Sequence, residues 1–147
     1  MSLRERLNEE LKASMKSKDG LRLSVIRMVR SSIKNREIDQ RHELDDREII
    51  EVISTLCKQR KESIRLFKEA NRKDLVDKEE KELALLLEFM PQQLTREELE
   101  DLVKKMIAES GAQGPKDMGR VMKTLQPAIA GRADGKLVSD IVKDCLA

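Results

Sequence analysis

Few side chains in this sequence can act as nucleophiles or metal ligands, and they lie far apart. The chain has one histidine, His42, and two cysteines, Cys57 and Cys145. His42 stands in a polar stretch with no cysteine or second histidine near it, so it is not expected to be a ligand. Both cysteines fall at apolar positions of helical patterns, where a reduced thiol behaves as a small hydrophobic group. Without a glycine-framed serine or an ATP-cradling loop, we predict no catalytic residue, no metal and no cofactor.

Positive charge is concentrated in two segments, although the whole chain is nearly neutral. Thirty Lys and Arg oppose 28 Asp and Glu, which gives a net charge of +2. Residues 21–36 include five basic and no acidic side chains, and residues 58–73 include seven basic and two acidic ones. Five basic residues of the second segment, here called the basic stripe, keep a 3,4,3,4 spacing: Lys58, Lys61, Arg65, Lys68 and Arg72. The stripe either binds phosphates or is a solvated face neutralised by acidic residues such as Glu79, Glu80 and Glu82.

A further group of candidate phosphate ligands lies near the C-terminal end. Its four basic residues, here called the tail cations, are Arg120, Lys123, Arg132 and Lys136, and its glycines are Gly119, Gly131 and Gly135. Glycines next to a helix N-terminus allow a phosphate to approach the backbone closely. Equally, these glycines would serve a tight turn with Asp134 as an N-cap. Both interpretations remain open from the sequence.

The elements that position these residues are all predicted to be helices. Only Phe67 and Phe89 are aromatic, so the core must be built from Leu, Ile, Val and Met. Apolar residues recur every three or four positions, as in Leu3, Leu7 and Leu11. Three capping boxes predict helix N-termini, and they are Ser2 with Glu5, Asp45 with Glu48, and Thr95 with Glu98.

Prolines mark two predicted helix ends and the domain boundary. Pro91 lacks an amide hydrogen and restrains the preceding residue, so the fourth helix, expected over residues 75–90, should end at Met90. Pro127 is expected to close the sixth helix in the same way. We predict an all-α fold with an N-terminal four-helix lobe over residues 1–91 and a small three-helix lobe over residues 92–147.

The sequence also bears on location. No apolar run approaches the roughly 20 residues needed to cross a bilayer. Residues 1–18 are charged throughout, unlike a secretory leader. We therefore expect a cytoplasmic protein with no membrane partner.

Short motifs along nearly the whole chain resemble the YqeY family. The N-terminal ones are Leu23-Ser24-Val25-Ile26-Arg27-Met28, Gln59-Arg60-Lys61 and Met90-Pro91 with Gln93-Leu94. Those of the tail are Met118-Gly119-Arg120-Val121-Met122 and Gly131-Arg132-Ala133-Asp134-Gly135 with Val138. The tail pattern is similar to the tail domain of GatB, a subunit of the glutamine-dependent aspartyl/glutamyl-tRNA amidotransferase, where it is a helical appendage that contacts tRNA. The resemblance implies a helical first domain, a GatB-like tail and a role related to tRNA or to the amidotransferase.

Three functions remain open at this point. The favoured one is a non-catalytic accessory protein of tRNA metabolism that binds tRNA or another structured RNA through the tail cations. A second is a protein-interaction adaptor. The third is a component of amidotransferase chemistry, a carbon-nitrogen ligase activity with glutamine as amido donor, in which an amidotransferase or an aminoacyl-tRNA synthetase is the partner.

Overall fold

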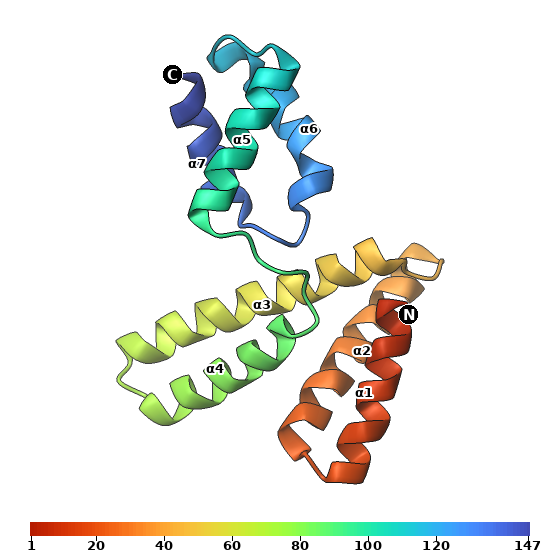
Figure 1. Ribbon diagram of the computed structural model, residues 1–147. Helices are drawn as coiled ribbons and strands as arrows, with labels where there is room; N and C mark the ends of the chain where they lie inside the picture. The colour runs from red at the N-terminus through yellow and green to blue at the C-terminus, as the bar shows by residue number, and fades with distance from the viewer. The chain divides into compact units, whose positions relative to one another are not determined.

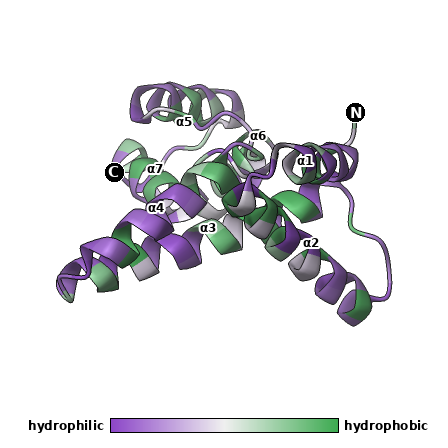
Figure 2. Cartoon of the chain, turned by 90° about the horizontal axis from the view of Figure 1, so that it is seen from below, coloured by the Kyte–Doolittle hydropathy of each residue, from purple (hydrophilic) through white to green (hydrophobic).

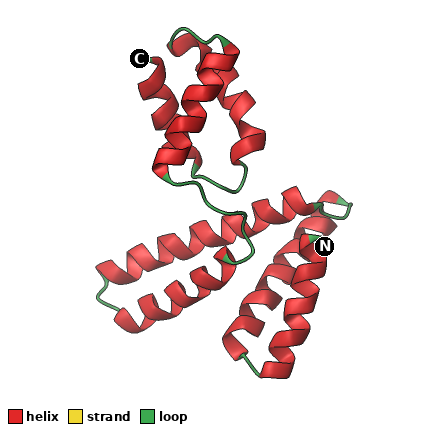
Figure 3. Cartoon of the chain, in the orientation of Figure 1, coloured by secondary structure: helices red, strands yellow, loops and turns green.

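The computed structural model describes all of residues 1–147 and consists of helices joined by loops (Figure 3). The α-helices are α1 Leu3–Ser17, α2 Gly20–Gln40, α3 Asp46–Glu69, α4 Lys73–Leu87, α5 Arg96–Ser110, α6 Met118–Ile129 and α7 Gly135–Leu146, with a 3-10 turn at Pro115–Asp117. This confirms the predicted all-α fold. None of the helices combines the length and the apolar character that a membrane span requires.

The chain divides into two compact units, Met1–Met90 and Pro91–Ala147. In the first unit, α1 pairs with α2 and α3 pairs with α4, so that it consists of two helical hairpins (Figure 1). Helix α2 contacts both helices of the second hairpin, and α1 contacts α3. In the second unit, α5, α6 and α7 each contact the other two.

Capping side chains explain where several helices begin. The Ser2 hydroxyl accepts a bond from the Glu5 amide at 3.1 Å, and the Glu5 carboxylate accepts one from the Ser2 amide at 3.2 Å. Asp45 and Glu48 bond in the same reciprocal way at the start of α3. These two capping boxes were predicted correctly. At α5 only half of the predicted box forms, because Thr95 accepts from the amide of the third helical residue without a bond in return.

Both helix ends predicted from proline were wrong. Helix α4 ends at Leu87 rather than Met90, because the amides of Phe89 and Met90 each bond to the carbonyl three residues earlier, at 3.1 Å, and tighten the final turn. Pro127 lies inside α6, which continues to Ile129. Pro127 removes one hydrogen bond of the helix, and α6 continues past it with Leu125 and Ile129, on either side of the proline, buried in the core of the second unit.

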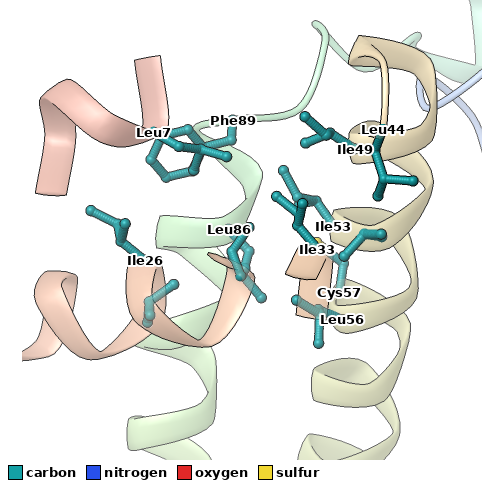
Figure 4. Close-up of a cluster of buried hydrophobic side chains, with 13 residues drawn as sticks. Leu7, Ile26, Ile33, Leu44, Ile49, Ile53, Leu56, Cys57, Leu86 and Phe89 are labelled. Atoms are coloured by element: carbon teal, nitrogen blue, oxygen red, sulfur yellow. The ribbon is translucent and has the colours of Figure 1, made fainter. Parts of the chain in front are cut away.

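Apolar side chains from all four helices of the first unit meet in one core (Figure 4). Leu7 comes from α1, Ile26 from α2 and Ile53 from α3, and each is at most 1% exposed. Leu86 of α4 and Phe89 in the turn after it belong to the same cluster, at 0% and 3% exposure. The end of α4 therefore fills the space where the two hairpins meet.

Polar contacts hold this terminal turn of α4 against the first hairpin. The Arg6 guanidinium lies 5.0 Å from the centre of the Phe89 ring and donates to the Glu88 carbonyl at 2.7 Å. The Glu88 carboxylate pairs with Arg22 of α2 at 2.6 Å. Residues of α1 and α2 thus both fix the position of the last turn.

A separate core fills the second unit. Its buried members come from all three helices and include Val103 of α5, Leu125 of α6 and Val142 of α7, each at 0% exposure. Hydrophilic and hydrophobic stretches alternate along helices such as α3, α4 and α5, as amphipathic packing requires (Figure 2).

The loop between α2 and α3 is closed by one carboxylate. Glu37 Oε2 accepts a bond from the Leu44 amide at 2.9 Å and another from the Arg4 guanidinium of α1 at 2.6 Å. These bonds favour the charged form, so the pKa of Glu37 lies below its ordinary value of 4.5, with the Leu44 amide as the main cause.

Replacing Glu37 by glutamine should destabilise the first unit in a pH-dependent way. Because the pKa is lower in the folded state, the charge stabilises the fold above about pH 4.5, and this contribution disappears as the pH falls through the folded pKa. Urea denaturation should therefore show a lower midpoint for Glu37→Gln at pH 7 and a shrinking difference below pH 4.5. Glu9→Gln, at an exposed carboxylate without an ion pair, is the control. A pH-independent difference would contradict this account.

Candidate nucleic-acid interface

The tail cations lie on α6, on the loop that follows it and on the first turn of α7. Gly131 makes this loop possible, because its φ of +71° is in the left-handed region that favours glycine. The next amide, that of Arg132, then bonds to the Ile129 carbonyl at 2.8 Å. Gly119 and Gly135 differ from Gly131 because neither has a positive φ, and a Cβ atom at either position would meet no atom within 4 Å. Packing within the protein does not require glycine at those two positions.

The tail cations differ in how far they are already engaged. Lys123 and Lys136 are exposed and have no carboxylate within 4 Å. Arg120 is exposed and 3.7 Å from the Asp117 carboxylate. Arg132 is half-buried, and its Nε donates to the Gln92 carbonyl at 3.0 Å. Asp134 occupies the N-cap position of α7, but its side chain makes none of the capping bonds expected there.

Arg132 thus has a structural role that the sequence did not reveal. The segment 91–94, here called the boundary segment because the second unit begins with it, is bonded to the loop between α6 and α7. Besides the Arg132 side-chain bond, the Leu94 amide donates to the Arg132 carbonyl at 2.9 Å, and the Gln93 amide side chain donates to the Gly131 carbonyl at 2.7 Å. These three bonds fasten the boundary segment to the second unit.

Removing the Arg132 side chain should expose the boundary segment to proteases. The lost hydrogen bond contributes about 1 kcal/mol, which corresponds to a roughly fivefold larger open population and a similarly faster cleavage within 91–94. Limited proteolysis of Arg132→Ala followed by mass spectrometry measures this rate. Lys136→Ala, which removes a neighbouring cation without a bond to the segment, should be cleaved like the unchanged protein. Equal rates for both variants would contradict the proposed role of Arg132.

Ion pairs neutralise most of the basic stripe. Its first four residues lie on α3, while Arg72 follows the end of that helix and precedes α4. Three members have carboxylate partners: Arg65 with Glu62 and Glu69, Lys68 with Glu80 at 3.6 Å, and Arg72 with Asp74 at 3.2 Å. Only Lys58 and Lys61 have no carboxylate within 4 Å. The Arg65 guanidinium also holds the pKa of the Glu62 carboxyl below its usual value through a hydrogen bond.

The basic segment 21–36 behaves differently, and sequence reasoning placed no site there. Arg22 pairs with Glu88 at 2.6 Å, and Arg36 pairs with Glu51 at 2.7 Å. The three remaining members, here called the groove cations, have no carboxylate within 4 Å and line one groove beside α1: Arg27, Arg30 and Lys34. The local charge was visible in the sequence, but the ion pairs that separate free from engaged cations were not.

The residues with nucleophilic or ligating side chains lie in separate environments. His42 is exposed in the loop before α3, with Nδ1 2.8 Å from the Glu43 carbonyl oxygen. Cys57 is 5% exposed in the core of the first unit, where burial raises the pKa of its thiol. Cys145 is half-buried in the second unit. Nowhere in the chain do three His, Cys, Asp or Glu side chains gather as they would around a metal ion.

Comparison with known proteins identifies the family. A family model described as Yqey-like protein matches residues 4–146. The chain belongs to the YqeY-like family. Among its relatives is Altered inheritance of mitochondria protein 41, mitochondrial, of Lachancea thermotolerans, which is 42% identical over 87 residues, or 58% of this chain and 46% of the relative. The protein of the same name in Pyrenophora tritici-repentis is 31% identical over 142 residues, which cover 95% of this YqeY-like chain and 78% of the relative.

These relatives correct the expected location of the protein, and they are longer than the part that this chain matches. The expected cytoplasmic location is wrong on this comparison, because the relatives of this YqeY-like chain are named as mitochondrial proteins. That expectation depended on the lack of a long apolar run and of a secretory leader, and neither observation separates cytoplasmic from mitochondrial proteins. The chain matches less than half of the length of the Lachancea thermotolerans and Kluyveromyces lactis relatives, at 46% and 44%.

Proposed function

We propose that this YqeY-like protein is a non-catalytic accessory protein that binds tRNA or another structured RNA. The observation that best supports this proposal is that the second unit has exposed cations close in sequence to two glycines, Gly119 and Gly135, where no side chain covers the backbone. Lys123 and Lys136 have no ion-pair partner, and Arg120 has only a distant one at 3.7 Å. The open space around Gly119 and Gly135 supports the proposal, because a phosphate can approach the backbone where no side chain stands.

The resemblance to the GatB tail supports the choice of RNA as the partner. In GatB the corresponding appendage contacts tRNA, and this proposal gives the second unit the same task. Contacts to phosphates position a protein without reading sequence, so binding is expected for tRNAs of any anticodon. An amidotransferase or an aminoacyl-tRNA synthetase is the natural protein partner for such an accessory role.

Charge reversal of the tail cations should weaken RNA binding and its dependence on salt. Each phosphate contact contributes roughly 0.7–0.9 to the slope of log K against log salt, so each of Arg120→Glu, Lys123→Glu and Lys136→Glu should lower that slope by about one unit or less. The loss should be similar for every tRNA tested. Fluorescence anisotropy with labelled tRNA over a salt series measures both quantities.

Two controls make this test specific. Lys104→Glu reverses an exposed, unpaired cation on α5 of the same unit and should change the slope less. Lys58→Glu with Lys61→Glu tests the two unpaired members of the basic stripe. If the stripe variant abolishes binding while the tail variants bind normally, the assignment of the interface to the second unit is wrong.

The purified chain should neither hydrolyse glutamine nor convert Glu-tRNA to Gln-tRNA. The buried Cys57 thiol, with its raised pKa, is a poor nucleophile, and exposed His42 hydrogen-bonds within its own loop. A coupled assay for released glutamate and acid-gel analysis of aminoacyl-tRNA measure the two activities. Turnover by the pure protein at a rate proportional to its concentration would refute the non-catalytic part of the proposal.

A protein-interaction adaptor is the second candidate, favoured by apolar side chains on the surface of the first unit. Ile38 is 65% exposed and Leu66 is 49% exposed. An apolar protein contact changes little with salt, whereas RNA binding falls steeply. Salt-insensitive capture of a protein partner, together with no measurable affinity for RNA, would replace the RNA proposal by this one.

A further inference from the structure

Three unpaired cations of the first unit lie in a row on one face of α2. Arg27, Arg30 and Lys34 are separated by three and four residues, so they project from the same side of the helix. Their neighbours in the sequence, Arg22 and Arg36, are neutralised by ion pairs at 2.6 and 2.7 Å. The groove cations are exposed, and no carboxylate lies within 4 Å of any of them.

These cations line a groove of about 570 Å³ between α1 and α2. Leu7 of α1 and Ile33 of α2 contribute apolar wall, and Asn8 and Ser31 contribute neutral hydrogen-bonding groups. At one end, Glu37 is already neutralised by Arg4 at 2.6 Å and bonded to the α2–α3 loop. The rest of the groove therefore carries an uncompensated positive charge on a concave surface.

The linear arrangement of the charges indicates the shape of the ligand. At 1.5 Å per residue, Arg27 and Lys34 are about 10 Å apart along the helix axis. A nucleic-acid strand carries one negative charge at every phosphate along its backbone, so each of the three cations in the row can meet one phosphate of the same strand. A compact anion would require cations that converge on one point, whereas a row of cations matches a chain of phosphates. The groove contains no aromatic side chain on which bases could stack.

We propose that the α1–α2 groove is a second RNA-binding site, which holds about three consecutive phosphates of an RNA strand without reading its bases. This inference rests on the proposed RNA-binding function but uses different residues in the other unit. Arg27 and Arg30 donate to phosphate oxygens through their guanidinium groups, and Lys34 contributes a point charge. Asn8 and Ser31 add hydrogen bonds to the strand.

The test compares the full-length protein with the triple variant Arg27→Gln, Arg30→Gln, Lys34→Gln. Binding of 20-nucleotide oligo(U) and oligo(A) RNA is measured by anisotropy over a salt series. Loss of three phosphate contacts should lower the salt slope by about two units and weaken binding about tenfold or more at 0.1 M salt, equally for both RNAs. The double variant Arg27→Lys, Arg30→Lys keeps the charge and should retain most of the affinity.

A matched control removes the same charge from the first unit outside the groove, with Arg47→Gln, Lys78→Gln and Lys81→Gln. These three side chains are also exposed and without ion pairs. Circular-dichroism melting confirms that both triple variants fold. If the control loses as much affinity as the groove variant, the effect is one of net charge and the groove is not a site.

Further outcomes separate this proposal from the one for the second unit. If the groove variant binds like the unchanged protein while the tail variants fail, the groove proposal alone is overturned. If the groove variant fails while the tail variants bind, the groove is supported and the tail assignment fails. If the unchanged protein binds no RNA, both fail. Tripolyphosphate that binds the groove as tightly as the 20-nucleotide RNA would overturn the choice of a strand as ligand.

Discussion

The first unit depends on the burial of Leu86 and Phe89 where its two helical hairpins meet. A single hairpin of amphipathic helices leaves one apolar face uncovered. Leu86 and Phe89, at the end of the second hairpin, pack in one cluster with apolar residues of both hairpins and so help to cover these faces. Fully burying a leucine or a phenylalanine contributes about 1.5–3 kcal/mol. Phe89 lies in the tightened turn after Leu87 and is buried in the same core, so one turn at the end of α4 takes part in the packing of the whole unit.

Ion pairing across helices determines which charges remain available on the surface. Glu88, Glu51 and Glu80 each neutralise a basic residue from another helix. Exposed pairs of this kind stabilise a fold by little, but they lower the positive potential available to a ligand. The basic segment of α2 therefore retains three free cations, while the stripe is compensated across helices only at Lys68 and by nearby carboxylates at Arg65 and Arg72.

In the second unit the same loop serves folding and the proposed binding surface. Gly131 makes the turn, and Arg132 holds the boundary segment through its side chain and its carbonyl. Of the four tail cations, Lys123 and Lys136 are the two without an intramolecular partner. A basic residue in a glycine-rich loop is thus not automatically a phosphate ligand, because the protein backbone competes for its donors.

The sequence alone determined the helical fold, two of the capping boxes and the family, because periodicity, caps and motifs are properties of neighbouring residues. It did not determine that α4 ends at Leu87 or that α6 passes through Pro127, since packing and turn geometry outweighed the local preference of proline. It also could not identify the cations that are engaged by partners far along the chain. The partners of Arg22 and Arg132 are 66 and 40 residues away in the sequence, and only the tertiary structure brings them within bonding distance.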